Sequence, residues 1–307
     1  MKVFYSIPEI DINQTTIVTV GSFDGLHLGH QSIINQLHLL AGDGKHVKTL
    51  VTFHPHPKEV LSPAGSSPME LLTPLEEKIN YLRELGLQVV VVIPFTREFS
   101  TTGYREFTLQ LLIGRLRMKK IVVGYDHAFG RNREGHPEQL KELGKEADFS
   151  VTVVQPFFLE NEVVNSSKIR HFLKKGQVEL ANRFLGRWYK ITGVVEKGNQ
   201  RGSSLGFPTA NIRPLHSNQL IPARGVYAVD VRLKGQRYQG MMNIGNRPTF
   251  NFDPLTLEVH IFNFSGLIYG ESIEIFFKKF IRDEKKFRDQ DELKRQLEND
   301  KKICLKL

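Results

Sequence analysis

Short apolar runs alternate with amphipathic stretches through the first half of the chain. The runs have the length and β-branched content of buried strands, and they lie at Thr15–Val20, Val47–Phe53, Val89–Phe95, Ile121–Gly124 and Val151–Val154. Helical spacing marks the segments between them, at Gln31–Leu40, Pro74–Leu85, Tyr104–Leu116 and Pro137–Ala147. This alternation predicts an α/β domain with a Rossmann-like parallel sheet between helices. Ligands of such sheets bind beyond the carboxyl ends of the strands.

The pattern changes near Gly186, where apolar residues begin to alternate with polar ones. This strand-like alternation covers Tyr189–Val195, Val226–Leu233, Tyr238–Ile244, Leu257–Phe264 and Ser272–Phe277, with Gly and Pro between the segments. It predicts an antiparallel β-barrel or sandwich, of which we favour the barrel. A last amphipathic helix is expected from about Asp289 to Lys301. We place the boundary at about residue 184, at the end of the helical segment Gln177–Leu185, which gives domains 1–184 and 185–307.

Length and charge are consistent with two soluble domains. The chain has 307 residues, and its formal charge of +9 is uneven, with 21 basic and 20 acidic residues up to 184 but 21 and 13 after it. A basic half suits phosphorylated ligands, an anionic membrane or nucleic acid, but the Lys and Arg residues form no dense block typical of nucleic-acid binding. The single cysteine, Cys304, and the absence of a long apolar run or leader-like start predict a cytoplasmic protein.

The segment Gly21–His30 directly follows a predicted strand and opens a helix. Its glycines let the backbone approach a phosphate closely, and a helix N-terminus presents unpaired N–H groups to it. His27 and His30 are three residues apart, so both can face one phosphate and stabilise charge during nucleotidyl transfer. The alternative is a tight turn with two surface histidines, which the combined context makes less favoured.

Three further segments follow predicted strands or begin a helix. They are His54–Pro57, which contains His56; Gly124–Gly135, with Asp126, Phe129 and Arg133; and Asn165–Arg170, with Ser166, Ser167 and Arg170. Imidazole, guanidinium and hydroxyl groups there can meet phosphates, Asp126 can hold a ligand hydroxyl, and Phe129 can pack on a ring. Each segment alone is equally compatible with an ordinary loop or cap. Their common place after strands of one sheet is the argument for a site.

The most specific segment is Gly193–Asn211, in which a Gly-rich loop with Gly198, Arg201 and Gly206 joins two predicted strands. It is not a Walker A loop, yet its backbone N–H groups can wrap a polyphosphate. Thr209 and Asn211 alternate, so both can point to one face of an extended segment and offer the hard oxygen ligands that Mg²⁺ prefers. A β-hairpin loop without a ligand is the alternative, and composition alone favours it.

Over essentially its whole length, the chain resembles the prokaryotic bifunctional riboflavin kinase/FMN adenylyltransferases, also called FAD synthetases. The resemblance implies that His27 and His30 act on the ATP phosphates and that Ser166, Ser167 and Arg170 hold the departing pyrophosphate. It also implies a nucleotide site formed with Gly21, Phe23, Asp24, Gly25, Gly29, His56, Asp126 and Arg133. One departure stands out, because Asn165-Ser166-Ser167 replaces the family's usual Ser-Ser-Thr.

In the second half the resemblance is carried by Pro208-Thr209-Ala210-Asn211, which keeps the family's Pro-Thr-Ala-Asn core. It implies that Thr209 and Asn211 bind Mg²⁺ and ATP, with Gly198, Arg201, Gly206 and Pro208 around the nucleotide. It further implies that Glu258 is the general base and that Arg282 and Phe287 lie on the flavin side. From the residues alone, Glu258 is equally a solvent-facing strand residue and Arg282 one charge in a solvated run.

The expected function is therefore ATP-dependent phosphorylation of riboflavin to FMN, followed by adenylyl transfer to FMN that yields FAD and pyrophosphate. Mg²⁺ is the expected metal, and no nucleic-acid or membrane partner is expected. One alternative is a single adenylyltransferase acting on another phosphorylated acceptor, with a β-domain that only binds. A second is an RNA-binding protein, since His-x-Gly-His also occurs in tRNA synthetases, but no RNP-like aromatic motif is present.

Overall fold

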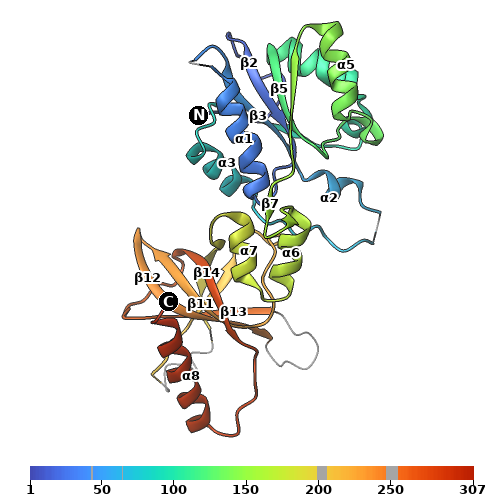
Figure 1. The fold of residues 1–307 in the computed structure, drawn as a ribbon. Helices are drawn as coiled ribbons and strands as arrows, with labels where there is room; N and C mark the ends of the chain where they lie inside the picture. Colours follow the sequence, from blue (N-terminus) through green and yellow to red (C-terminus); the bar gives the residue numbers. More distant parts are fainter. Residues whose placement is uncertain (43, 64, 199–205, 247–254) are drawn as a thin grey trace. The chain divides into compact units, whose positions relative to one another are not determined.

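The computed structural model describes residues 1–42, 44–63, 65–198, 206–246 and 255–307. The chain forms two compact units, Met1–Asn165 and Ser166–Leu307. Figure 1 shows the first as a sheet flanked by helices and the second as a barrel with helices around it. Among the described residues, none of the helices combines the length and the apolar character that crossing a bilayer requires.

A six-stranded sheet, with every strand pair parallel, forms the centre of the first unit, in the order β1-β4-β3-β2-β5-β6. Its strands are β1 (Lys2–Phe4), β2 (Thr16–Val20), β3 (Val47–His54), β4 (Val89–Pro94), β5 (Met118–Gly124) and β6 (Ser150–Val154). Because β2 lies between β3 and β5, the chain leaves it in one direction and returns on its other side. Such a reversal of strand order opens a crevice at the carboxyl ends.

Apolar clusters cover both faces of this sheet. On one face, α1 (Leu28–Leu40) and α3 (Leu75–Glu84) bury Ile34, Leu37, Ile79 and Leu82 against the strands. On the other face, α5 (Pro137–Ala147) and the π-helical η2 (Phe107–Arg115) bury Leu111, Leu112, Leu140 and Leu143. Figure 1 shows α1 and α3 on the opposite side of the sheet from α5. Shorter elements complete the unit: α2 (Pro57–Leu61), η1 (Phe99–Thr101), α4 (Tyr104–Glu106), η3 (Arg131–Arg133), and the hairpin β7 (Phe158–Leu159) and β8 (Glu162–Val163).

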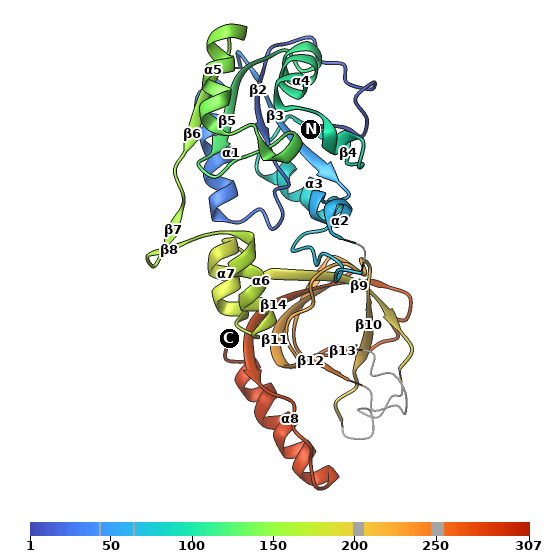
Figure 2. The ribbon, with the colours of Figure 1, turned by 90° about the vertical axis from the view of Figure 1, so that its right-hand side faces the viewer.

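The second unit is a closed antiparallel barrel in the order β10-β13-β12-β11-β14-β9, closed by the pairing of β9 with β10 (Figure 2). Its strands are β9 (Tyr189–Glu196), β10 (Ala210–Pro214), β11 (Gly225–Leu233), β12 (Gln236–Asn246), β13 (Leu255–Ile261) and β14 (Ser272–Arg282). Alternation of buried and more exposed residues along β9 matches the period of two read from the sequence.

Three helices pack around the barrel. They are α6 (Ser166–Lys174), α7 (Val178–Leu185) and α8 (Gln290–Cys304). Helix α7 lies against β14 and β9, and the Asn182 side chain joins them by donating to the Phe277 carbonyl and accepting from the Tyr189 N–H. Helix α8 lies against β11 and β12. Both α6 and α7 therefore belong to the compact unit of the barrel, although they precede the expected boundary at residue 184.

The fold class expected from the sequence is confirmed in both halves. The barrel, rather than the sandwich, is the arrangement formed by the period-two segments. The last helix begins one residue after its cap Asp289, whose carboxylate accepts the N–H of Glu292. Strand β1, at the edge of the sheet beside β4, lies outside every predicted segment because its three residues are too few for a periodic signal.

Candidate active sites

The predicted phosphate loops meet at one edge of the parallel sheet. Strands β3, β2 and β5 are neighbours, and the segments that follow their carboxyl ends contain His56, Gly21–His27 and Asp126. The structure therefore brings together three sequence-predicted segments at the crevice where α/β sheets bind nucleotides. This convergence depends on strand order, which no single motif specifies.

Two histidines mark the N-terminus of α1 at this edge of the sheet. His27 is the N-cap, 5 % exposed, and its Nδ1 accepts the His30 N–H at 3.3 Å. The two imidazole rings stack with their centroids 3.7 Å apart and an interplanar angle of 17°. A Cβ on Gly29 would lie 3.2 Å from the His27 ring, so the small residue leaves room for this ring. Because Nδ1 of His27 accepts, the neutral ring carries its proton on Nε2, which makes it a donor suited to phosphate oxygens.

A buried lysine that sequence reasoning missed contacts this loop. Lys78 on α3 is 5 % exposed, and its Nζ donates to the Ser22 carbonyl at 2.7 Å, which also accepts from Thr52 Oγ1 at 3.2 Å. Burial lowers the pKa of Lys78, and the carboxylates of Asp24 and Glu59 oppose that shift. The available signal was a Lys within the apolar spacing of α3, where a charge is unexpected without a partner.

Asp24 itself is turned away from solvent. Its carboxylate, 1 % exposed, accepts the N–H groups of Leu72 and Thr73 at 3.0–3.1 Å. These bonds tie the phosphate loop to the segment that enters α3. Asp24 was expected to contact ATP or its phosphates, and the contacts above give its carboxylate a loop-supporting role.

The remaining predicted residues of the first unit lie at the same edge in different settings. His56 caps α2, with Nδ1 accepting the Lys58 N–H at 3.1 Å, while Asp126 and Arg133 are exposed in the segment after β5. Phe23 is buried with its ring 4.9 Å from that of His30. The expectation that Phe129 packs on a ligand ring is not supported, because this ring is buried in the core 5.3 Å from Phe107.

Ser166, Ser167 and Arg170 lie in the first two turns of α6, in the second unit. Ile169 and Leu173 on the same helix are buried, whereas Ser167 is exposed. The role of the two serines and Arg170 toward pyrophosphate stays a prediction.

The second cluster lies on three neighbouring barrel strands. Asn211 on β10 pairs with Glu258 on β13, and Glu258 pairs with Asn243 on β12. Residues directly opposite each other point to the same face, so two amides flank this carboxylate. Thr209, just before β10, donates its hydroxyl to Glu258 Oε2 at 3.3 Å. Sequence reasoning named Thr209, Asn211 and Glu258 but gave Asn243 no role.

A glycine makes room for the Asn211 amide. A Cβ on Gly198 would lie 1.8 Å from Asn211 Nδ2, so any side chain there would displace the amide. Gly206 and Pro208 are exposed next to Thr209, whereas Arg201 lies outside the described residues. Within the described ranges, no group of three or more His, Cys, Asp or Glu side chains is placed to hold a metal. The Thr209 hydroxyl, the Asn211 amide oxygen and the Glu258 carboxylate are nevertheless hard oxygen donors, which fit Mg²⁺ shared with phosphates.

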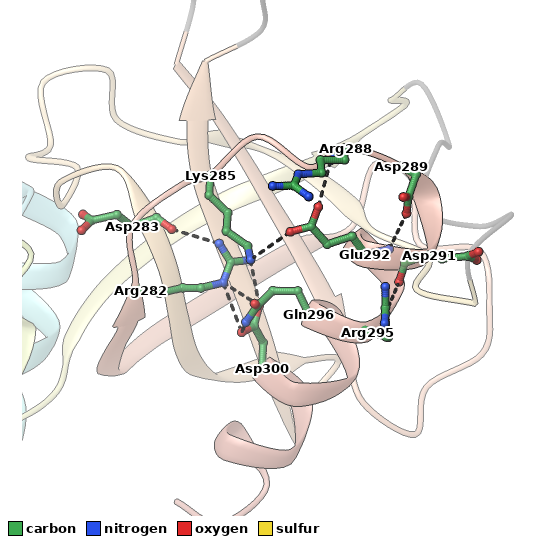
Figure 3. Close-up of polar contacts among 10 residues, drawn as sticks. All are labelled: Arg282, Asp283, Lys285, Arg288, Asp289, Asp291, Glu292, Arg295, Gln296 and Asp300. Atoms are coloured by element: carbon green, nitrogen blue, oxygen red, sulfur yellow. Dashed lines mark hydrogen bonds and ion pairs between the residues drawn. The ribbon is translucent and has the colours of Figure 1, made fainter.

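Arg282, one of the two residues expected on the flavin side, lies in the polar network of Figure 3. Arg282 donates from Nε and Nη2 to the Asp300 carboxylate of α8 at 2.8–3.2 Å, and from Nη1 to the Asp283 carbonyl at 2.9 Å. Asp300 is fully buried and also accepts from Gln296 Nε2 at 2.8 Å. The Phe287 ring lies 5.7 Å from the Arg282 guanidinium. The structure thus gives Arg282 an anchoring contact to α8.

Comparison with known proteins agrees with this division into two sites. The model of the FAD synthetase family matches residues 9–168, and that of the riboflavin kinase family matches residues 185–307. The chain belongs to the bifunctional riboflavin kinase/FMN adenylyltransferase family. The family resemblance read from the sequence is thereby confirmed.

Relatives in this family match along almost the whole chain. The protein from Bacillus subtilis is 37 % identical over 95 % of this chain and 92 % of its own length. The one from Listeria monocytogenes is 39 % identical over 94 % and 91 %. Both are named bifunctional riboflavin kinase/FMN adenylyltransferase. A crystal structure from Streptococcus pneumoniae, described as a macrolide-efflux protein, is 30 % identical with a TM-score of 0.92 and covers 100 % of this chain and 99 % of its own.

The two family matches divide the candidate residues between the two halves of the chain. His27, His30, His56 and Asp126 fall in the FAD synthetase part, and Thr209, Asn211 and Glu258 fall in the riboflavin kinase part. The match to the barrel half weighs against the alternative in which this half only binds.

Proposed function

We propose that the chain performs two consecutive reactions, at two separate sites. The barrel unit phosphorylates riboflavin with ATP, giving FMN and ADP. The sheet unit then transfers AMP from a second ATP to FMN, giving FAD and pyrophosphate. The observation that carries the proposal is that each unit holds its own cluster of polar side chains, the stacked His27–His30 pair in one and the Thr209–Glu258 contact in the other. We assign the phosphate chemistry to these two clusters.

In the kinase reaction the terminal ribityl hydroxyl of riboflavin attacks the γ-phosphorus of ATP. Glu258 accepts the hydroxyl proton, an O–P bond forms, and the bond from the γ-phosphorus to the β–γ bridging oxygen breaks to release ADP. Thr209 and Asn211 would hold Mg²⁺ and the phosphates, with Gly198, Gly206 and Pro208 around them. The metal, when bound, neutralises charge on the β- and γ-phosphates. The hydrogen bond from Thr209 supports this assignment because it links the phosphate side to the base.

In the adenylyl transfer a phosphate oxygen of FMN attacks the α-phosphorus of ATP. The new P–O–P bond forms as the bond to the α–β bridging oxygen breaks, and pyrophosphate leaves. His27 and His30 donate to the oxygens that gain charge, with the N–H groups of α1 behind them. Lys78 adds a buried hydrogen-bond donor to the Ser22 carbonyl of the loop. The resemblance further assigns Ser166, Ser167 and Arg170 to the pyrophosphate.

Some finer expectations remain part of this proposal. We propose Mg²⁺ as the metal, a functional boundary near residue 184, and a cytoplasmic setting. The first is supported by the hard oxygen donors at Thr209 and Asn211, and the second by the start of the riboflavin kinase match at 185. The lone Cys304, which is buried, is consistent with a reducing compartment. The expectation that nucleic acid does not bind stays a prediction, for which filter binding with tRNA at two salt concentrations is a direct test.

Two variants separate the sites. Glu258→Ala is expected to lower riboflavin phosphorylation by about 10²–10⁴-fold, while FAD formation from supplied FMN continues. His30→Ala is expected to lower adenylyl transfer by about 10²–10³-fold, while FMN still accumulates. The measurement is chromatographic separation of the flavins after incubation with ATP and Mg²⁺.

Matched controls are available in each unit. Glu298→Ala removes an exposed carboxylate of α8, and His38→Ala removes a histidine further along α1, which contacts the Leu85 carbonyl. Neither control is expected to stop either step. A folded Glu258→Ala or His30→Ala protein that loses both activities would contradict the assignment of one reaction to each unit.

A further inference from the structure

A buried histidine holds the residue that precedes Thr209. Strand β10 begins its pairing with β13 at Ala210, opposite Val259. Pro208 therefore lies before the paired residues, and its carbonyl needs another donor if it is to be held. His260 supplies one, with its Nδ1 2.8 Å from the Pro208 oxygen. Because a carbonyl only accepts, this Nδ1 carries the proton.

The His260 ring is itself fixed on several sides. It is 7 % exposed, and its centroid lies 5.2 Å from the Phe207 ring and 5.5 Å from the Phe262 ring. Phe207 and Phe262 belong to a buried cluster that includes Met241 on β12 and Cys304 on α8. The histidine therefore connects Pro208, near the end of the Gly-rich segment, to a packed part of the barrel.

Thr209 is the next residue after the held carbonyl. Its hydroxyl contacts Glu258, and Glu258 and His260 are alternate residues of β13 on one face. One strand thus carries both the proposed base and the group that fixes the proposed metal ligand opposite it. A shift of Pro208 would move the Thr209 hydroxyl relative to the base.

We propose that His260 is a positioning residue of the kinase site, which sets the place of Thr209 through the Pro208 carbonyl. This inference rests on the kinase site proposed above. His260 touches neither phosphate nor flavin in this role, so its removal affects the use of Mg²⁺·ATP rather than the binding of riboflavin. Among the described residues, Lys301 and the Pro208 carbonyl act on this histidine from the elements packed around it.

Three substitutions at this position test the hydrogen bond directly. Asparagine places an N–H donor at the position of Nδ1, glutamine places it near Nε2, and leucine removes it. His260→Gln and His260→Leu are expected to raise KM for ATP or lower kcat of the kinase by roughly 3- to 10-fold, the factor for one net hydrogen bond. His260→Asn is expected to restore most of that loss.

The control measurements identify the step affected. Riboflavin binding, followed by flavin fluorescence, and FAD formation from supplied FMN are expected to change less than 2-fold in all three variants, an effect below about 0.4 kcal/mol. Equal kinetics for the asparagine and glutamine variants, or a loss confined to riboflavin binding, would overturn the inference. Because Glu258→Ala tests the kinase site independently, a normal His260→Gln enzyme beside an inactive Glu258→Ala enzyme would reject only the positioning role. Circular dichroism spectra and melting curves identify variants that do not fold. If the leucine variant does not fold, the comparison of the asparagine and glutamine variants still tests the hydrogen bond.

Discussion

Replacing Asp300 by asparagine decides whether Arg282 anchors α8 or serves the flavin. The Asp300 carboxylate is fully buried and accepts the Nε and Nη2 protons of Arg282, whose side chain is only 19 % exposed. Gln296 adds a third donor. The substitution keeps the size of the side chain but removes the negative charge, which leaves a largely buried guanidinium without its counterion.

The expected cost follows from that burial. Removing one partner of a buried ion pair destabilises a protein by about 3–5 kcal/mol, because the other charge stays desolvated. For a unit of this size, each kcal/mol lowers Tm by roughly 2–4 °C, so we expect a decrease on the order of 10 °C. Added salt should change this result little, since a buried pair is poorly screened.

Calorimetric melting of a double-mutant cycle measures the effect. Arg282→Met and Asp300→Asn should each lower Tm, and the two together should lower it by less than the sum, because they remove one shared contact. Lys234→Met is a matched control in the same unit, since Lys234 and Glu271 form an exposed pair at 2.8 Å. Its expected cost is below about 1 kcal/mol.

The opposite result would support a role for Arg282 in binding the flavin. If Asp300→Asn leaves Tm unchanged while Arg282→Met raises only KM for riboflavin, then the anchoring role is wrong. Additive effects in the cycle would likewise show that the two side chains do not depend on each other.

Three more predictions concern the sheet unit and the metal. Lys78→Met removes the buried donor to the Ser22 carbonyl. We therefore expect the rate of adenylyl transfer to fall roughly 10-fold, the effect of losing about one hydrogen bond. The flavin assay should show an unchanged rate of riboflavin phosphorylation. Burial lowers the pKa of His127 from 6.5 to about 4, and its Nε2 has no hydrogen-bond partner among the described residues. As the pH falls, the unfolded chain therefore takes up the proton first, so the free energy of unfolding should fall by at most roughly 3 kcal/mol between pH 6.5 and about pH 4. Urea titrations at several pH values measure this dependence, and His127→Phe should flatten it. An unchanged dependence of the unfolding free energy on pH in that variant would contradict the prediction. Chelation by EDTA should stop riboflavin phosphorylation, and Mg²⁺ should restore it in the parent protein but poorly in Thr209→Val, because the hydroxyl ligand is gone.

Local pattern was enough to predict the elements and several of the site residues. Periodicity is a property of neighbouring residues, so the strands β2 to β6 and the helices α1, α3 and α5 were all expected. The position of His27 between a strand and a helix predicted its place at a helix N-terminus, and the structure confirms it as the N-cap of α1. Glu258 was assigned its role only through the family resemblance, because a strand carboxylate by itself is ambiguous.

Contacts between residues far apart in the sequence could not be predicted from local pattern. Lys78 and Ser22 are 56 residues apart, Glu258 and Thr209 are 49 apart, and both pairs meet only through strand order and register. The contacts of Asp24 with the amides of Leu72 and Thr73, and of Arg282 with Asp300, likewise could not be read from the sequence, and the ligand roles expected for both residues stay predictions. Local sequence does not specify which groups will share a buried space.

The amino-acid order by itself determined that this chain has an α/β half and a β half, and which family it resembles. Hydrophobic spacing and short motifs depend only on residues that are close together in the sequence. Tertiary structure alone decided that the barrel closes between β9 and β10, that a lysine lies beneath the phosphate loop, and that His260 reaches the Pro208 carbonyl. The physical reason is that burial and hydrogen bonding depend on distances across the fold, which arise only when separate elements pack together.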